Sequence, residues 1–204
     1  MARVPTSDAV HDGPLTEAPL DPDERKWRNA AEVGADESRR EWADAAREVL
    51  LGVAGSYHEV ITHKDLATEV QDRTGLRTKQ LRHYWISDVL GQVSVDCYGG
   101  QEPLLSSLCV NAAGSVGERY AQAVRDTYGE EPEDADAHAA RERLKCYTHF
   151  DADLPSDGGS AALTPKLSAA RSRTRKALLV ETPRPTCRTC HMQLPATGVC
   201  DHCG

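Results

Sequence analysis

Four cysteines near the end of the sequence have the spacing of a metal site. Two residues separate Cys187 from Cys190, two separate Cys200 from Cys203, and nine lie between the pairs. Two intervening residues let both thiolates of a pair face one cation at the zinc–sulfur distance of about 2.3 Å. Two such pairs complete a tetrahedron, so we expect these four residues to bind one zinc ion.

The nine residues between the pairs suit a small hairpin, with Pro195 and Gly198 supplying its turn. Residues 183–204 resemble a four-cysteine zinc ribbon, and we expect that structure for them. Disulfides or a redox pair are the alternatives. No secretory leader and no thioredoxin-like pattern accompany the cysteines, which favours a metal. Four thiolates fill the coordination shell, so the zinc is expected to be structural.

No catalytic site is expected elsewhere in the chain. The sequence has no Gly-rich phosphate loop, no His-Glu-x-x-His helix and no Gly-x-Ser-x-Gly elbow. Cys109 is the strongest candidate nucleophile, but its neighbours Leu108, Val110 and Asn111 supply neither a base nor a positive charge. We therefore expect Cys97, Cys109 and Cys146 to be small buried residues. The sequence predicts a protein that is not an enzyme, and it identifies no small-molecule substrate.

Charge is distributed unevenly along the chain. The 204 residues have a net charge of −8, but Lys166 and the residues after it contain seven Lys and Arg against two acidic residues. That region is therefore +5, and the remainder is −13. A basic segment of this kind can bind a polyanion or pack against its own acidic body. Its candidate nucleic-acid contacts are Arg171, Arg173, Arg175 and Lys176.

A second group of cations lies in the stretch expected to form the core. Thr62 can cap a helix that carries Leu66 and Val70 inward, and Gly75 can end it. A second helix is expected to start at Thr78 or a neighbour, with Leu81, Trp85 and Val89 on its buried face. The cations of this second helix are candidate nucleic-acid contacts: Arg77, Lys79, Arg82 and His83.

A short two-stranded wing is expected after these helices. Val93, Val95 and Cys97 alternate with polar residues, as in a half-buried strand. Gly99 and Gly100 mark a tight turn, and the run 103–110 supplies the second strand.

Residues 57–120, about a third of the chain, resemble the winged-helix half of the O6-alkylguanine-DNA alkyltransferases and their alkyltransferase-like relatives. The matching motifs occur in the family's order: Ile61-Thr62, Leu66-Ala67, Arg82, Pro103, and Gly114-Ser115-Val116-Gly117 with Tyr120. The resemblance implies a winged helix with a tendency to bind DNA. Leu104 and Leu105 follow Pro103 where the family has its acceptor cysteine and histidine, so alkyl transfer is not expected.

The fold class predicted is mainly α with a small β wing. Residues 1–24 are proline-rich and acidic and are expected to be disordered. Residues 25–150 form the helical winged-helix-like domain, 151–182 a linker and basic segment that could be helical over 166–180, and 183–204 the ribbon. No membrane span or secretory leader is evident, so a soluble, cytoplasmic protein is expected.

These patterns predict a non-catalytic nucleic-acid-binding protein, with DNA as the expected partner. The alternative is a protein-interaction adaptor whose acidic body and ribbon dock onto a larger assembly. The acidic body and the modest number of cations on the second helix weigh against DNA.

Overall fold

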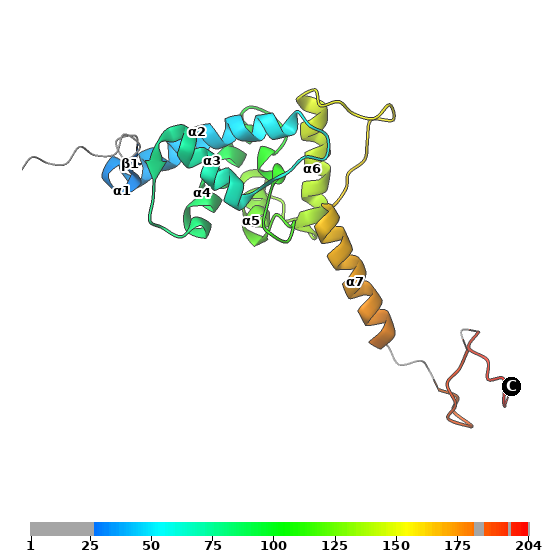
Figure 1. The fold of residues 1–204 in the computed structure, drawn as a ribbon. Coiled ribbons are helices and arrows are strands. Elements are labelled where there is room, and N and C mark those ends of the chain that lie inside the picture. Colours follow the sequence, from blue (N-terminus) through cyan, green and yellow to red (C-terminus); the bar gives the residue numbers. More distant parts are fainter. Residues whose placement is uncertain (1–26, 182–185, 196, 204) are drawn as a thin grey trace, which may run out of the picture.

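The chain is mainly helical, as expected, with little strand structure (Figure 1). This computed structural model describes residues 27–181, 186–195 and 197–203, so the predicted disordered tail at 1–24 lies outside the described residues. The helices are α1 Ala30–Val33, α2 Ala35–Ala54, α3 His63–Thr74, α4 Arg82–Gly99, α5 Glu118–Tyr128, α6 Ala135–His149 and α7 Pro165–Glu181, with a 3-10 turn η2 at Leu105–Leu108. The strands are β1 Arg28–Asn29, β2 Ile61–Thr62, β3 Leu76–Arg77 and β4 Cys109–Val110. None of the described helices is both long enough and apolar enough to cross a membrane.

Helix α2 lies at the centre of the core and packs against both α3 and α4. Trp42 of α2 and Trp85 of α4 are each 3% exposed, and their ring centroids are 4.4 Å apart. Ala46 and Leu50 continue the buried face of α2 at four-residue spacing. The aromatic pair and this apolar stripe fix α4 relative to the rest of the body.

Helix α3 begins and ends where the sequence predicts. The hydroxyl of Thr62 accepts a hydrogen bond from the backbone N–H of Asp65 at 3.1 Å, which satisfies one of the free N–H groups of the first turn. Gly75 ends the helix with φ 64°, a left-handed conformation that glycine adopts without a side-chain clash. Leu66 and Val70 are fully buried, as expected.

The predicted strand at Val93, Val95 and Cys97 is wrong, because helix α4 continues through all three residues to Gly99. Val89, Val93 and Cys97 are each 0% exposed and recur every four residues, whereas Val95 is 52% exposed. A buried helical face therefore overrides the short alternation that suggested a strand. The predicted turn at Gly99 and Gly100 is the end of this helix.

The second half of the predicted wing also differs from expectation. Most of the apolar run after Pro103 forms η2, and only β4 is extended. Strand β4 pairs in parallel with β2, so Ile61 faces Cys109 and Thr62 faces Val110. The run is buried, and because its one strand pairs in parallel with β2, it does not form the expected antiparallel hairpin.

The segment predicted as a linker packs against the body over residues 157–164, which we call the strap. It crosses beside α6 and leads directly into α7 (Figure 1). Hydrogen bonds to distant residues of the body hold the strap, which composition alone does not predict. Its anchoring hydrogen bonds are Ser160 N to Tyr57 Oη at 2.8 Å, Arg143 Nη2 to Ala162 O at 3.2 Å, and Thr164 Oγ1 to Gly114 O at 2.8 Å.

The basic segment, whose helicity the sequence left open, forms helix α7. Its first turns contact the body, and its C-terminal half projects away from it (Figure 1). From Arg171 to Leu178 every residue is exposed.

Two adjacent glycines of the strap provide a matched test of its docking. Gly158 and Gly159 both have positive φ, 82° and 72°, but only at Gly159 would a Cβ meet the Tyr57 hydroxyl, at 2.6 Å. We expect Gly158→Ala to lower the free energy of unfolding by about 1 kcal/mol through backbone strain, and Gly159→Ala by roughly 2–3 kcal/mol because of the added clash. Urea denaturation of both variants, with limited proteolysis of the strap, measures the difference. Equal losses would contradict this docking.

Candidate metal centre and nucleic-acid interface

The four C-terminal cysteines converge on one point. The sulfur atoms of Cys187, Cys190, Cys200 and Cys203 all lie within 4.8 Å of one another, and those of Cys190 and Cys200 are 3.5 Å apart. A disulfide requires about 2 Å, and all four thiols are free. Sulfurs at the corners of a tetrahedron around zinc are about 3.8 Å apart. The predicted ligands are therefore brought together at spacings that a metal ion fits.

Backbone hydrogen bonds shape the first cysteine turn around Cys187. The N–H of Thr189 donates to the Cys187 sulfur at 3.4 Å, and the N–H of His191 donates to the Cys187 carbonyl at 2.9 Å. An antiparallel bridge joins Thr186 to Gln193. Backbone N–H groups of Cys190 and Thr189 lower the pKa of Cys187 to about 6, because they stabilise the thiolate that a metal needs.

The second cysteine pair is less enclosed. Gly198 has φ 74°, and its N–H donates to the Pro195 carbonyl at 3.0 Å, the hydrogen bond expected of the predicted turn. Cys203 is exposed, and its pKa is raised to about 12, first by its hydrogen bond with the Cys190 side chain. A cation bound among four thiols would replace these shared protons. His202 is exposed and lies outside this group of ligand atoms.

The other three cysteines are buried, as the sequence predicts. Burial raises the pKa of Cys109, with a smaller contribution from Asp65. Burial also raises the pKa of Cys146 to about 12, and it raises that of Cys97. Their thiols therefore stay protonated at neutral pH, which makes them poor nucleophiles.

The cations predicted on one recognition helix occupy three different elements. Arg77 lies in β3, Lys79 lies in the loop that follows, and only Arg82 and His83 belong to α4. The helix starts later than predicted because the Thr78 hydroxyl accepts the N–H of Gln80 at 3.1 Å, which favours a turn. All four predicted contacts are exposed and lie within seven residues of the chain.

The start of α4 is electrostatically unusual for a helix. Leu81 is its N-cap, is 63% exposed rather than buried as predicted, and provides no side-chain hydrogen bond. The first turn contains no acidic residue, although the helix dipole favours negative charge there. Lys79 and Arg82 form no ion pair with any described residue. Backbone N–H groups and unpaired cations therefore face solvent together, an arrangement that attracts anions.

Two aromatic rings accompany these cations. The Arg77 guanidinium carbon lies 3.3 Å from the centre of the Trp27 ring, a cation–π contact that holds the side chain. Tyr84 of α4 is 59% exposed. Burial lowers the pKa of His63, and Arg82 lowers it further, so this imidazole adds no positive charge at neutral pH.

Comparisons with protein-family models, curated proteins and solved structures found no match for the chain. The case for each site therefore depends on its own geometry and charge.

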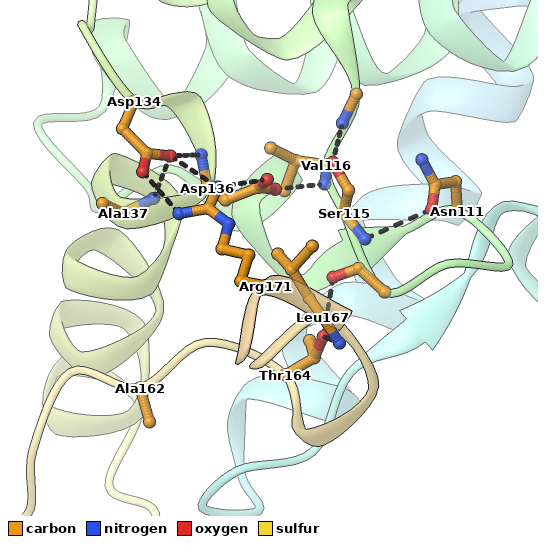
Figure 2. Close-up of polar contacts among 12 residues, drawn as sticks. Asn111, Ser115, Val116, Asp134, Asp136, Ala137, Ala162, Thr164, Leu167 and Arg171 are labelled. Atoms are coloured by element: carbon orange, nitrogen blue, oxygen red, sulfur yellow. Dashed lines mark hydrogen bonds and ion pairs between the residues drawn. The ribbon is translucent and has the colours of Figure 1, made fainter. Parts of the chain in front are cut away.

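The predicted basic group on α7 divides into one paired and three unpaired cations. Figure 2 shows Arg171 turned toward the start of α6, where it donates to Asp134 at 2.5 Å and to Asp136 at 3.0 Å. Arg173, Arg175 and Lys176 are exposed and form no ion pair with a described residue. Arg171 therefore serves to dock α7, and the other three remain open to a partner.

Sequence reasoning missed the acidic partners of Arg171. Asp134 is the N-cap of α6, because its carboxylate accepts the N–H groups of Asp136 and Ala137, each at 3.0 Å. Its hydrogen bond with Arg171 lowers the pKa of Asp134 well below its usual range. An aspartate before a helical run does predict an N-cap. Its pairing with a residue 37 positions away cannot be predicted from local sequence patterns.

We expect Arg171→Gln to undock α7 and to lower the free energy of unfolding by less than about 1 kcal/mol, because both partners are partly exposed and screened. Because folding lowers the pKa of Asp134, the ion pair contributes fully to stability above the pKa of Asp134 in the unfolded chain, about 3.9. That contribution is lost as pH falls through the lower pKa of the folded protein. The difference from the wild-type protein should therefore be constant between about pH 6 and 8 and shrink below about pH 4. Urea denaturation across this range measures it. Arg173→Gln is the matched control, and an equal cost there would refute the docking role.

Proposed function

We propose that the chain is a non-catalytic nucleic-acid-binding protein, with DNA as its partner, that uses the start of α4 as its contact surface. The main support for this proposal is a group of exposed cations without carboxylate partners. They lie at a helix start whose N-cap residue makes no side-chain hydrogen bond. This group of cations stands out because the surrounding residues 27–165 contain 24 Asp and Glu against 14 Lys and Arg. Phosphates would supply the negative charge that this helix start lacks.

The order of elements around this surface supports a helix-turn-helix mode of docking. Helix α3 is followed by the turn at Gly75, strand β3, a short loop and then helix α4. The residues that the resemblance to alkyltransferase-like domains singles out include Arg82. In such docking the first residues of the second helix meet base edges in the major groove. Arg82 would then read a base, Lys79 would contact phosphate, and exposed Tyr84 offers a ring to an adjacent base or sugar.

The projecting half of α7 would extend this contact along the backbone. Arg173, Arg175 and Lys176 contribute positive charge on an exposed helix, and such charges raise affinity without sequence preference. The contribution is independent of α4, so it can be removed separately.

We propose zinc as the ion at the four cysteines. Thiolates in a tetrahedral set of four favour zinc over magnesium or calcium, which prefer oxygen ligands. With no open coordination position the ion would be structural, and its binding energy would fold the C-terminal segment.

One observation favours the alternative function of a protein-interaction adaptor. At the opposite end of α4, Tyr98 and Tyr128 are 53% and 38% exposed and pack edge to face with centroids 5.0 Å apart. Exposed aromatic pairs are enriched at protein interfaces, and residues 126–140 beside them contain no Lys or Arg. An adaptor would use this end of the helix and would bind nucleic acid weakly or not at all.

The zinc proposal predicts one equivalent of zinc per chain in protein purified under reducing conditions. Elemental analysis measures it. The double variant Cys187→Ser/Cys200→Ser should lose the metal, because two ligands cannot hold it at the same affinity, whereas Cys97→Ser, outside the cluster, should retain it. Chelation should leave the helical circular-dichroism signal of the body largely unchanged. Full metal content in the double variant would refute this ligand set.

The nucleic-acid proposal predicts a strong dependence of affinity on salt. If the cations near α4 and those on α7 both engage and neutralise about five or six phosphates, log affinity should fall with log salt at a slope of about −5. Removing residues 166–204 should roughly halve that slope. Arg82→Ala should weaken binding by about 1–3 kcal/mol at every salt concentration if the side chain reads a base. Fluorescence anisotropy with a labelled duplex measures all three effects.

Arg73→Ala provides the control for Arg82→Ala. Arg73 lies on α3 and is paired with Glu69 at 2.8 Å and Glu48 at 3.5 Å, so its loss should leave the salt slope unchanged. If the full chain shows no salt-dependent binding to any duplex or single strand at about 50 mM salt, where non-specific binding is strong, the adaptor function replaces this proposal.

A further inference from the structure

A hollow lies between α6 and the strap, away from the residues assigned to nucleic acid. It measures about 650 Å³, including space open to solvent. Body residues His58, Arg143 and Tyr147 line one side. Residues of the strap and Pro165, the first residue of α7, line the other. Among the described residues, no Asp or Glu lines this hollow.

Arg143 is a buried cation without a counter-ion. It is 4% exposed, and it forms no ion pair with any described carboxylate. Its guanidinium donates to two neutral acceptors, the Ser107 carbonyl at 3.0 Å and the Ala162 carbonyl at 3.2 Å. Arginine has five N–H donors and is rarely buried without a partner of opposite charge, because desolvating the charge is costly.

The two carboxylates of α6, the helix that carries Arg143, are already engaged elsewhere. Glu142 accepts hydrogen bonds from Lys145 at 2.7 Å and from the N–H of Leu104 at 3.3 Å. Asp136 accepts the N–H of Val116 and pairs with Arg171 (Figure 2). Burial lowers the pKa of Arg143, the direction expected for a cation that lacks compensation. An anion in the hollow would supply that compensation.

A second feature of the hollow is a strained histidine. His58 has φ 66°, a left-handed conformation that is uncommon for residues other than glycine and costs roughly 1 kcal/mol or more. Its ring stacks on Tyr57 with centroids 3.8 Å apart, and Tyr57 in turn holds the strap at Ser160. The strain therefore places an imidazole, a hydrogen-bond donor, beside the hollow.

We propose that this hollow binds a small oxyanion, the phosphate or carboxylate group of a small molecule, with Arg143 as its counter-ion and His58 as a further contact. The strap covers the site, since the guanidinium that faces the anion also holds the strap at Ala162. Binding would therefore stabilise the strap and the start of α7 that follows it. The proposal uses none of the residues assigned to nucleic acid and stands or fails independently of that function.

Thermal unfolding of the full chain tests the proposal directly. Melting temperatures are measured in sodium chloride and, at equal ionic strength, with inorganic phosphate or acetate added up to about 50 mM. Because a ligand that binds only the folded state stabilises it, we expect a saturable rise of roughly 5 °C or more with one of the two oxyanions. A rise with phosphate alone identifies a phosphate ligand, and a rise with acetate alone identifies a carboxylate.

Two substitutions separate specific binding from a general salt effect. Arg143→Met should abolish the rise. Its stability in chloride should stay close to that of the wild-type protein, because removing an uncompensated buried charge offsets the loss of the hydrogen bonds to Ser107 and Ala162. Arg47→Met is the control, since Arg47 has its own carboxylate, Glu102, at 2.6 Å and does not line the hollow. It should lower stability and keep the rise.

His58→Gly removes the imidazole and the backbone strain together. Because residue 58 is exposed, this variant should fold at least as well as the wild-type protein. The anion concentration that gives half of the rise in melting temperature should increase about threefold or more. The absence of a saturable rise with either oxyanion, or an equal rise in Arg143→Met, overturns the proposal. If Arg143→Met does not fold, an unchanged midpoint in His58→Gly overturns it instead.

Discussion

The contact between Trp42 and Trp85 determines the placement of helix α4 and of the candidate surfaces at its two ends. It fixes α4 across α2, and the buried spacing of Val89, Val93 and Cys97 then keeps the helix regular to its end. One end of α4 presents unpaired cations, and the other presents Tyr98, which packs against Tyr128 at the end of α5. A rigid helix therefore separates two surfaces of different chemistry, and the body serves to hold it.

Charge pairing decides what each cation can do in this acidic chain. Arg171 faces two carboxylates and becomes part of the fold, whereas Lys79 and Arg82 face none and stay open to solvent. Arg143 is a third case, because it is buried and has only neutral acceptors. The same side-chain type thus has three roles, set by the nearest carboxylate and by access to water.

Local chemistry could be predicted from the sequence, and long-range packing could not. The Thr62 cap, the Gly75 stop and the two cysteine pairs depend on residues a few positions apart, so spacing alone was sufficient. The strand predicted at Val93 and Val95 is wrong because this short alternation lies within a helix that starts at Arg82 and has a buried face from Trp85 onward. The prediction of a linker at the strap failed for a different reason. Its Gly, Ser and Asp composition is typical of a linker, and its anchors on Tyr57 and Arg143 come from distant parts of the chain.

The docking of Arg171 also sets a rotational phase for the rest of α7. Each residue of an α-helix advances by about 100° and 1.5 Å, so Arg175 lies one turn beyond Arg171 on the same side, and Arg173 points nearly opposite. A single inserted residue after Arg171 would turn every later side chain by about 100° without changing composition or charge. The direction in which the exposed cations face is thus set by one residue at the base of the helix. A small change in the length of α7 would alter the direction of these side chains far more than their distance from the body.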